Sequence, residues 1–421
     1  MANTKAQQWQ KVKLGEIIQP LLTGKKDSNY STIDGKYDFY TCSQEVFKCP
    51  TFSFENSGII LGGNNANAVY PLFFKEYGKF ELYQRTYFIK SNSDNFYDKF
   101  LYYVLRIELE NLKSVSVGST TKYLTKPIIE NILIPNFNIS TQTKIATILS
   151  NYDDLIYNNT QRIKILEEMG KKLYDEWFVK FRFPVGQNSP SLEGVATQVD
   201  GVVSRPMVDS GTDFGIIPEC WEVRKLGDLF KVKSGFPFKS ILYSENGKYS
   251  VITIKNVKEN DFDIDNVKYT NELPKNQEYI LLNNCDILLS LTGNVGRVSA
   301  VFTGNKIPVL NQRVAKFIAK SDIVSNGLLY FYLSSGKIFN KLVSMSKGVA
   351  QQNLSPVEVE NTCEILLPIR DILELSNIIF NDNLDKIINL NNQNQKLREM
   401  RDLLLPKLIR GDVDVSELEV V

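Results

Sequence analysis

The chain has 421 residues, with 49 basic and 48 acidic side chains and a net charge of +1, so it carries no global basic field that would mark a nonspecific nucleic-acid binder. Its length fits two or more domains, and 43% hydrophobic and 23% charged residues are ordinary for a globular protein. It contains no histidine, which excludes histidine-containing zinc sites and Ser-His-Asp catalysis. The five cysteines form no Cys-x-x-Cys pair, so we predict reduced thiols and no metal site.

The sequence also lacks the motifs of several other protein classes. Residues 1–8 have no apolar signal core, and no stretch approaches the roughly 20 apolar residues that span a bilayer. We therefore predict a cytoplasmic protein with no membrane partner. There is no P-loop, no dinucleotide-binding glycine motif after a strand, and no Asn-Pro-Pro-aromatic run of the kind that amino-methyltransferases use. We expect a binding protein that is not an enzyme and holds no cofactor.

Residues 1–138 are predicted to form a first domain of the α+β class with a modest sheet. Three runs of β-branched and aromatic residues, at 39–41, 58–61 and 86–89, read as strands separated by Gly, Asn and Pro. Residues 100–112 have the apolar spacing of an amphipathic helix.

Residues 139–184 are predicted to form one long helix. Pro135 ends the preceding strand, and Ser140 caps the helix. Apolar positions then recur every seven residues, which is the spacing of a coiled-coil seam. One row holds Ile156, Ile163, Gly170 and Trp177, and the offset row holds Asn159, Leu166 and Leu173. At 1.5 Å per residue an unbroken helix of this length would extend about 60 Å.

The rest of the chain repeats this plan. Residues 185–213 are a predicted linker, 214–368 a second domain, and 369–421 a second long helix with a C-terminal tail. The run Trp-Glu-Val-Arg-Lys-Leu-Gly-Asp-Leu from Trp221 answers Trp-Gln-Lys-Val-Lys-Leu-Gly-Glu-Ile from Trp9, and residues 328–342 answer the helix at 100–112. The second pair of helical rows holds Ile387, Asn394, Arg401 and Leu408, and Leu390, Leu397 and Leu404.

A duplicated module of about two hundred residues is therefore the main feature of the sequence. One long helix cannot bury its seam alone, and antiparallel pairing of the two copies is the simplest solution; the alternative is that each stripe packs on its own domain. The predicted fold is α+β, with two pseudo-symmetric domains separated by a pair of long antiparallel coiled-coil helices. The residues expected to pack in the seam are Ile156, Ile163, Leu166, Leu173, Trp177, Ile387, Leu390, Leu397, Leu404 and Leu408.

Polar clusters at predicted turns indicate what the domains bind. Arg and Lys contact guanine edges or phosphates, and Asn and Gln contact adenine edges, so these clusters favour a nucleic-acid partner. The candidates in the first domain are Lys25, Lys26, Asn64, Asn65, Lys122 and Tyr123. Those in the second domain are Lys233, Lys239, Lys255, Asn256, Asn294, Arg297, Gln351, Gln352 and Asn353.

Each of these clusters has a plainer interpretation. Any single candidate can be a solvated loop residue, and residues 62–65 fit a turn better than a phosphate-binding loop. Residues 293–296 have the Gly-x-x-Gly form of an RNA-binding KH loop, but they follow a strand-like run and are predicted to be a hairpin turn. The Gln-Arg pairs at 84–85 and 312–313 belong to the same polar clusters, but they could instead be buried structural pairs inside strands.

Several motifs resemble the specificity subunit of a Type I restriction–modification system over nearly the whole chain. The most specific are Lys-Leu-Tyr-Asp-Glu-Trp-Phe-Val-Lys-Phe-Arg-Phe-Pro at 172–184 and Leu-Arg-Glu-Met-Arg-Asp-Leu-Leu-Leu-Pro-Lys-Leu-Ile-Arg-Gly-Asp-Val-Asp at 397–414. Ile-Pro-Glu-Cys-Trp at 217–221, Lys-Leu-Gly-Asp-Leu at 225–229, Ser-Gly at 234–235 and Phe-Lys-Ser at 238–240 match the start of a target-recognition domain.

The resemblance implies a double-stranded DNA partner and two target-recognition domains, each reading one half of a split DNA sequence, on helices that fix the spacer. It also implies that two methyltransferase subunits dock on the helices, joined in the full complex by restriction and translocase subunits, and that S-adenosylmethionine binds the methyltransferase partner. The first domain departs from the pattern, because Lys25-Lys26-Asp27 stands where the second has Phe238-Lys239-Ser240. A two-domain coiled-coil adaptor that does not bind DNA remains the alternative, whereas a fused enzyme would need a catalytic domain that this sequence lacks.

Overall fold

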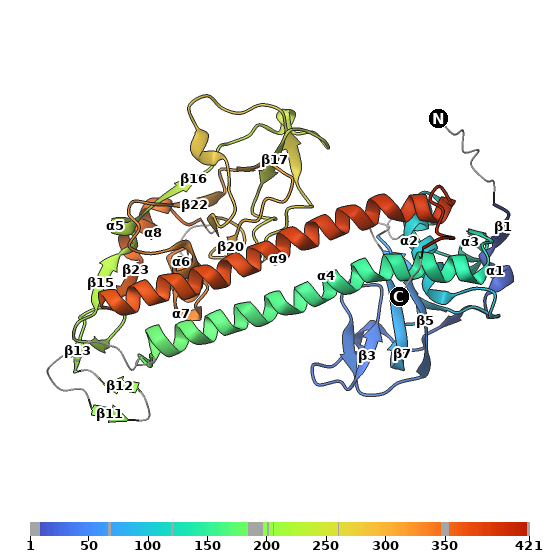
Figure 1. The fold of residues 1–421 in the computed structure, drawn as a ribbon, viewed down its shortest axis with the longest axis horizontal. Helices are drawn as coiled ribbons and strands as arrows, with labels where there is room; N and C mark the ends of the chain where they lie inside the picture. The colour runs from blue at the N-terminus through green and yellow to red at the C-terminus, as the bar shows by residue number, and fades with distance from the viewer. Residues whose placement is uncertain are drawn as a thin grey trace. The chain divides into compact units, whose positions relative to one another are not determined.

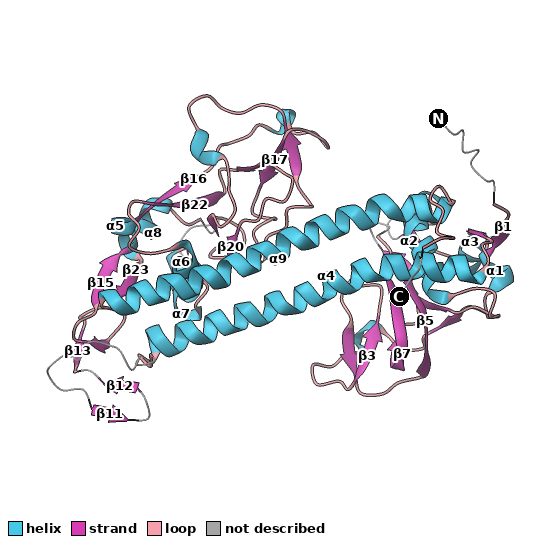
Figure 2. Ribbon diagram, in the orientation of Figure 1, coloured by secondary structure: helices cyan, strands magenta, loops and turns pink. Residues whose placement is uncertain are grey.

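The computed structural model describes residues 9–65, 69–118, 122–183, 197–199, 202–204, 206–259, 261–346 and 353–418. Its packing divides the chain into two compact units, Met1–Ile156 with Leu397–Val421, and Tyr157–Lys396. Each unit contains one of the two domains and a part of both long helices (Figure 1). The α+β class predicted from the sequence is confirmed in both units (Figure 2).

The first unit is built on a mixed six-stranded sheet. Its strand order is β2-β8-β5-β7-β3-β4, and only β3 and β7 run parallel. The strands are β2 (Leu22–Thr23), β3 (Tyr37–Tyr40), β4 (Phe47–Cys49), β5 (Phe54–Gly62), β7 (Leu72–Leu82) and β8 (Thr86–Ile89). The three predicted runs fall on β3, β5 and β8, so these strands are confirmed, although β3 begins two residues and β5 four residues earlier than predicted.

Both faces of this sheet carry buried apolar side chains. Successive residues of a strand point to opposite faces, so neighbouring residues of β5 belong to different cores. On one face Ile59 and Leu61 belong to the hydrophobic core that also contains the buried residues of helix α2 (Asp98–Val115). This helix extends beyond the predicted 100–112 at both ends. On the other face Ile60 packs with Phe80 and Phe88 in a smaller aromatic core. The short helices of this unit are α1 (Leu14–Ile17), η1 (Ser28–Tyr30) and α3 (Lys126–Glu130).

The second unit contains a four-stranded sheet of order β16-β22-β19-β20 and a three-stranded sheet of order β18-β17-β21. The strands are β16 (Phe230–Ser234), β17 (Tyr249–Ile252), β18 (Lys268–Thr270), β19 (Ile287–Ser290), β20 (Val298–Ala300), β21 (Pro308–Leu310) and β22 (Val314–Ala319). The helices are α5 (Leu226–Leu229), η3 (Ser240–Leu242), η4 (Glu278–Ile280), α6 (Asn326–Leu333), α7 (Gly336–Met345) and α8 (Pro356–Thr362).

One prediction for this unit needs correction. The single helix expected at 328–342 is two helices, α6 and α7, because Ser334 and Ser335 end one helix and begin the next.

The described part of the predicted linker 185–213 contains short strands. β11 (Thr197–Val199) pairs with β12 (Val202–Ser204), and β13 (Met207–Asp209) pairs with β14 (Ile216–Pro218), which lies just beyond the predicted linker. The rest of 185–213 lies outside the described residues, except 206 and 210–213.

The duplication is visible in the way each domain is closed. In the first unit β1 (Lys11–Lys13), which follows Trp9, pairs with β10 (Leu133–Pro135), which precedes the first long helix. In the second unit β15 (Glu222–Lys225), which follows Trp221, pairs with β23 (Glu364–Leu367), which precedes the second long helix. A glycine after the first strand of each pair lies against a glutamate on a short helix, Gly15 against Glu130 and Gly227 against Glu360.

The two long helices are α4 (Ile139–Tyr174), followed by a π-helical turn (Asp175–Val179), and α9 (Arg370–Arg410). Within the second unit, Tyr174 lies 6.4 Å from Phe380 between ring centroids. Asn383 donates to the carbonyl oxygen of Leu166 at 3.1 Å, and Asn394 lies 3.4 Å from the Thr160 hydroxyl. Residue numbers fall in α4 as they rise in α9, so the helices are antiparallel, as predicted.

All ten residues expected in the seam are buried or half-buried. Trp177, Ile387 and Leu408 are buried, and the half-buried residues are Ile156, Ile163, Leu166, Leu173, Leu390, Leu397 and Leu404.

Two equivalent positions of the seam, Arg401 and Gly170, are packed differently in the two units. In the first unit, Arg401 has a side chain only 9% exposed and donates to Asp153 at 2.5 Å. Asp153 also accepts a 2.7 Å hydrogen bond from Tyr103 of α2. In the second unit the equivalent of Arg401 is Gly170, and a side-chain carbon there would overlap the ring of Phe331, the equivalent of Tyr103. An ion pair therefore stabilises the packing of the helices at Arg401, whereas close apolar contact does so at Gly170.

The buried Arg401 guanidinium is paired with two carboxylates, Asp153 at 2.5 Å and Asp402 at 2.9 Å. We predict that Asp153→Ala destabilises the chain by about 3 kcal/mol, because it removes the closer carboxylate and leaves the buried charge only partly compensated. The double variant Asp153→Leu with Arg401→Met should recover most of this loss, since it also removes the buried positive charge. Urea unfolding followed by circular dichroism measures both variants. A double variant no more stable than Asp153→Ala would show that the charge pair does not act as described.

Candidate nucleic-acid interface

A three-residue turn between two strands occurs in both units with the same backbone hydrogen bonds. In the first unit the turn is Tyr83–Gln84–Arg85, between β7 and β8, and in the second it is Asn311–Gln312–Arg313, between β21 and β22. A glycine packs against the residue before each turn. A side-chain carbon on Gly24 would overlap the carbonyl of Leu82, and one on Gly235 would overlap the carbonyl of Leu310. Only glycine permits this close approach.

Each turn is held by four backbone hydrogen bonds, which match one for one. In the first unit these are Tyr83 N to Tyr40 O (3.0 Å), Gln84 N to Lys26 O (2.9 Å), Thr86 N to Tyr83 O (2.9 Å) and Gly63 N to Arg85 O (2.8 Å). In the second unit they are Asn311 N to Ile252 O (3.0 Å), Gln312 N to Phe236 O (3.1 Å), Val314 N to Asn311 O (3.0 Å) and Leu291 N to Arg313 O (3.0 Å). The turn is thus tied to three separate segments in both units.

Four of the predicted DNA-binding residues lie together beside this turn in the first unit. Strand β6 (Asn64–Asn65) pairs antiparallel with β9 (Lys122–Tyr123), so that Asn64 lies opposite Tyr123 and Asn65 opposite Lys122. Because the backbone N–H of Gly63 donates a hydrogen bond to the carbonyl oxygen of Arg85, this two-stranded ribbon adjoins the Gln-Arg turn. The backbone pairing therefore brings together residues that are more than fifty positions apart in the sequence.

The second unit has an equivalent ribbon. Thr292 pairs with Asn353, and Leu354 N donates to Leu291 O at 2.8 Å, just as Leu124 N donates to Gly63 O at 2.8 Å in the first unit. Asn294 is exposed two residues beyond Thr292. The structure thus brings Asn294 and Asn353 to the same region. Gln351 and Gln352, which were predicted to act with them, lie outside the described residues.

Buried polar atoms mark the same position in both ribbons. Among the described residues, the side-chain oxygens Asn64 Oδ1 and Thr292 Oγ1 are buried without a hydrogen-bond partner. Nearby, Tyr87 donates to the carbonyl oxygen of Leu124 at 2.9 Å, and burial raises the pKa of the Tyr87 hydroxyl. Burial also raises the pKa of the Cys42 thiol beside Arg85, so this cysteine is a poor nucleophile.

The other predicted lysines occupy several positions. Lys25, Lys233, Lys239 and Lys255 are exposed, and Lys26 is half-buried. Two of them lie over aromatic rings, with Lys26 Nζ 4.3 Å from the Tyr30 centroid and Lys233 Nζ 4.8 Å from that of Tyr279. Arg297 is half-buried at the end of the turn that joins β19 and β20. That connection is the hairpin predicted for residues 293–296, with positive φ at both Gly293 and Gly296.

The predicted role of Asn256 is wrong. Its side chain is 1% exposed. Its Oδ1 accepts from the backbone and hydroxyl of Thr253, both at 2.9 Å, and its Nδ2 donates to the carbonyl oxygens of Asp263 and Asn266 at 2.8 and 2.9 Å. All of its hydrogen-bonding capacity is used inside the domain, so it shapes a turn and cannot contact a base.

The alignment of the two opening loops also changes by one residue. The 3-10 helix η1 begins at Ser28 after Asp27, and the equivalent η3 begins at Ser240 after Lys239. Asp27, not Lys26, therefore matches Lys239. The two units carry opposite charges at this exposed position.

The two Gln-Arg pairs belong to the polar clusters of the sequence but were not among the predicted DNA-binding residues. The interpretation of them as buried pairs inside strands is wrong, because Gln84, Arg85, Gln312 and Arg313 are all exposed in turns. Their repetition in both copies was the available signal. The pattern of strands around them did not reveal that each pair begins two residues after a strand ends and directly precedes the next strand.

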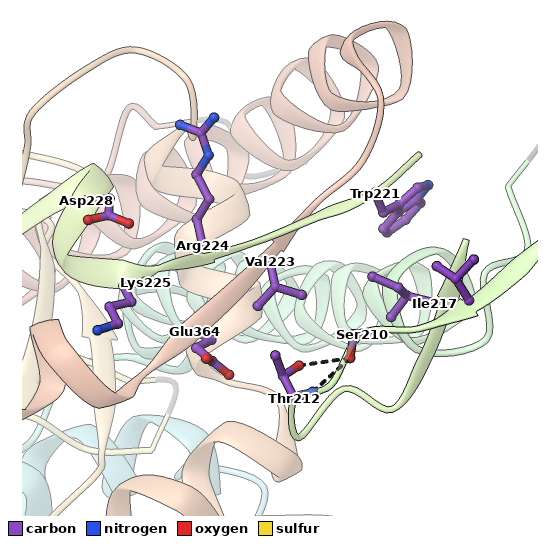
Figure 3. A pocket seen from close by; sticks show the side chains of 10 residues that line it. Ser210, Thr212, Ile217, Trp221, Val223, Arg224, Lys225, Asp228 and Glu364 are labelled. Carbon is purple, nitrogen blue, oxygen red and sulfur yellow. Dashed lines mark hydrogen bonds between the residues drawn. The ribbon is translucent and has the colours of Figure 1, made fainter. Parts of the chain in front are cut away.

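A separate recess in the second unit has a volume of about 620 Å³ and is lined by residues of β13, β14, β15 and β23. Figure 3 shows that its charged side chains diverge, with Arg224 and Lys225 on opposite sides of their strand. Arg224 is paired with Glu222 at 2.9 Å. Nothing in this arrangement converges on a common ligand.

Two further findings concern metals and membranes. In the described ranges, no group of three or more cysteine, aspartate or glutamate side chains is arranged to hold a metal ion. No helix in the same ranges is long and apolar enough to cross a lipid bilayer.

Both units contain the same glycine, Gln-Arg turn and adjoining ribbon, and each domain is followed by a long helix. These features describe a binding protein that is built from two copies of one module. Comparison with known proteins identifies it, because residues 6–168 and 218–399 both match the family described as the Type I restriction modification DNA specificity domain. The chain belongs to this family, as its motifs indicated. It is thus a specificity subunit of a restriction–modification system, a non-catalytic protein of sequence-specific DNA recognition.

Individual relatives agree. The chain is 30% identical over 331 residues to the Type I restriction enzyme MjaIX specificity subunit of Methanocaldococcus jannaschii, covering 77% of this chain and 71% of the relative. It is 33% identical to the EcoDI specificity subunit of Escherichia coli over 165 residues, which are 39% of this chain and 35% of that one. Its fold matches the crystal structure of a Type I S subunit from M. genitalium with a TM-score of 0.59, at 16% identity, covering 97% of this chain and 98% of that one.

We predict that Asn256→Ala lowers the free energy of unfolding by about 2–4 kcal/mol, because it leaves buried backbone groups without partners. The neighbouring exposed variant Lys255→Ala should change it by less than about 0.5 kcal/mol. Thermal unfolding measures both. If Asn256→Ala were fully stable and altered DNA recognition, the structural role assigned to this side chain would be incorrect.

Proposed function

We propose that the chain reads a DNA target made of two separated halves, with one half bound by each recognition domain. The observation that carries this proposal is the matched scaffold. The same glycine, turn and ribbon occur in both units, but the side chains around them differ: Asn64 against Thr292, Tyr123 against Asn353, and Asp27 against Lys239. A constant frame with different polar side chains is expected of two readers of different sequences.

The same proposal assigns the remaining predicted residues. Lys25, Lys26, Lys122, Lys233, Lys239 and Lys255 supply positive charge for the DNA backbone, and Asn65, Asn294, Arg297, Gln351 and Gln352 are candidates for base contacts. The paired helices α4 and α9 fix the distance between the two half-sites. They also carry the docking surfaces for two methyltransferase subunits and, in the full complex, for restriction and translocase subunits. S-adenosylmethionine binds the methyltransferase, and this chain holds no cofactor.

We predict that replacing residues 10–135 by the same region of a relative changes one half of the methylated DNA motif and leaves the other half unaltered. The replaced region lies within the first unit and excludes both long helices, so the second unit keeps all of its own packing. Methylome sequencing of a host that expresses the chimera with the methyltransferase subunit gives the motif directly.

The reciprocal exchange of residues 222–367 is the control, because it should change the other half. A chimera in which both halves change would contradict independent reading. The adaptor alternative predicts no motif dependence on this chain at all, and an electrophoretic shift assay with and without methyltransferase separates it from DNA recognition.

A further inference from the structure

The Gln-Arg turns stand out because their side chains have no partner. Gln84 and Arg85 in the first unit, and Gln312 and Arg313 in the second, are exposed. For these four side chains the described part of the structure contains neither a hydrogen bond nor an ion pair. Most other exposed arginines differ in this respect; Arg224, Arg370 and Arg410 are paired with Glu222, Glu374 and Asp412.

Folding does not require Gln and Arg at these positions. The turns are held by backbone hydrogen bonds and by the close approach of Gly24 and Gly235, and none of these contacts involves a Gln or Arg side chain. An exposed turn residue tolerates many side chains, and replacing one away from special features usually changes stability by less than about 0.5 kcal/mol. The presence of the same dipeptide in both copies therefore needs a cause outside the fold.

The surroundings suggest that cause. Each arginine lies beside a ribbon whose side chains differ between the two units. The backbone carbonyl oxygen of the arginine accepts a hydrogen bond from the residue that precedes this ribbon, Gly63 for Arg85 and Leu291 for Arg313. Residues that read different bases must differ, whereas residues that bind the sugar-phosphate backbone can stay the same, because both half-sites present the same phosphates. The guanidinium group binds phosphate with two parallel hydrogen bonds.

We propose that Arg85 and Arg313 bind backbone phosphates at equivalent places in the two half-sites, with Gln84 and Gln312 as adjoining hydrogen-bonding groups. Each arginine sets the position of its domain on the duplex independently of sequence, and the side chains of the adjoining ribbon then contact the bases. The rigid attachment of the turn to three segments lets one phosphate contact orient the whole recognition surface. This inference rests on the proposed function, since it requires that both domains bind DNA.

The test uses the full chain in complex with its methyltransferase subunit, with two fluorescent duplexes. One duplex carries the motif found by methylome sequencing, and the other carries a scrambled sequence. Arg85→Gln and Arg313→Gln should each weaken binding to both duplexes by about tenfold. Each should also reduce the slope of log K against log salt by about 0.9, the value for one phosphate contact. The methylated motif should be unchanged.

Matched variants separate this role from others. Arg85→Lys should keep most of the salt slope because it keeps the charge, and Arg224→Gln, on the exposed edge of β15, should leave both affinity and slope unaltered. Thermal unfolding midpoints should match those of the unaltered chain. An unchanged salt slope in the Arg→Gln variants, or a relaxed motif at a single base position, would overturn the proposal. If the unaltered complex showed no preference for the motif duplex, the proposed function itself would fail.

Discussion

The structure depends on the burial of two long apolar stripes, one on α4 and one on α9. Neither stripe is wide enough to belong to a self-contained domain, and each compact unit accordingly includes parts of both helices. This constraint explains why the sequence had to be duplicated within one chain, since the second copy supplies the partner that the first helix lacks.

The seam is not uniform, and the exceptions are informative. Arg401 and Gly170 occupy equivalent positions, yet one is compensated by Asp153 and Tyr103 while the other admits the ring of Phe331. A buried ion pair is weak support for stability but is well suited to fixing one register. The two ends of the helix pair are thus chemically distinct, which favours a single antiparallel arrangement over shifted ones.

Sequence reasoning was most successful where periodicity decides the structure. The heptad rows from Ile156 to Trp177 and from Ile387 to Leu408, the strands around 59 and 87, and the repeat itself follow from local patterns. It failed where tertiary contacts decide. Nothing local shows that Asn256 turns inward to bond Asp263 and Asn266, or that residues 328–342 break at two serines. The pairing of Asn64 with Tyr123 depends on a contact across the domain, which the sequence of either segment alone does not reveal.

The central claim is that two readers are held at a distance set by paired helices. Its most direct test is the insertion of one heptad into each helix, after Thr160 and after Gln393. These points lie at the same level of the helix pair, because Thr160 contacts Asn394. The inserted turns add about 10 Å to the helices, or about three base pairs at 3.4 Å each. Methylome sequencing should then show the same two half-sites with a spacer longer by about that amount. An unchanged spacer, or altered bases within either half-site, would contradict the account.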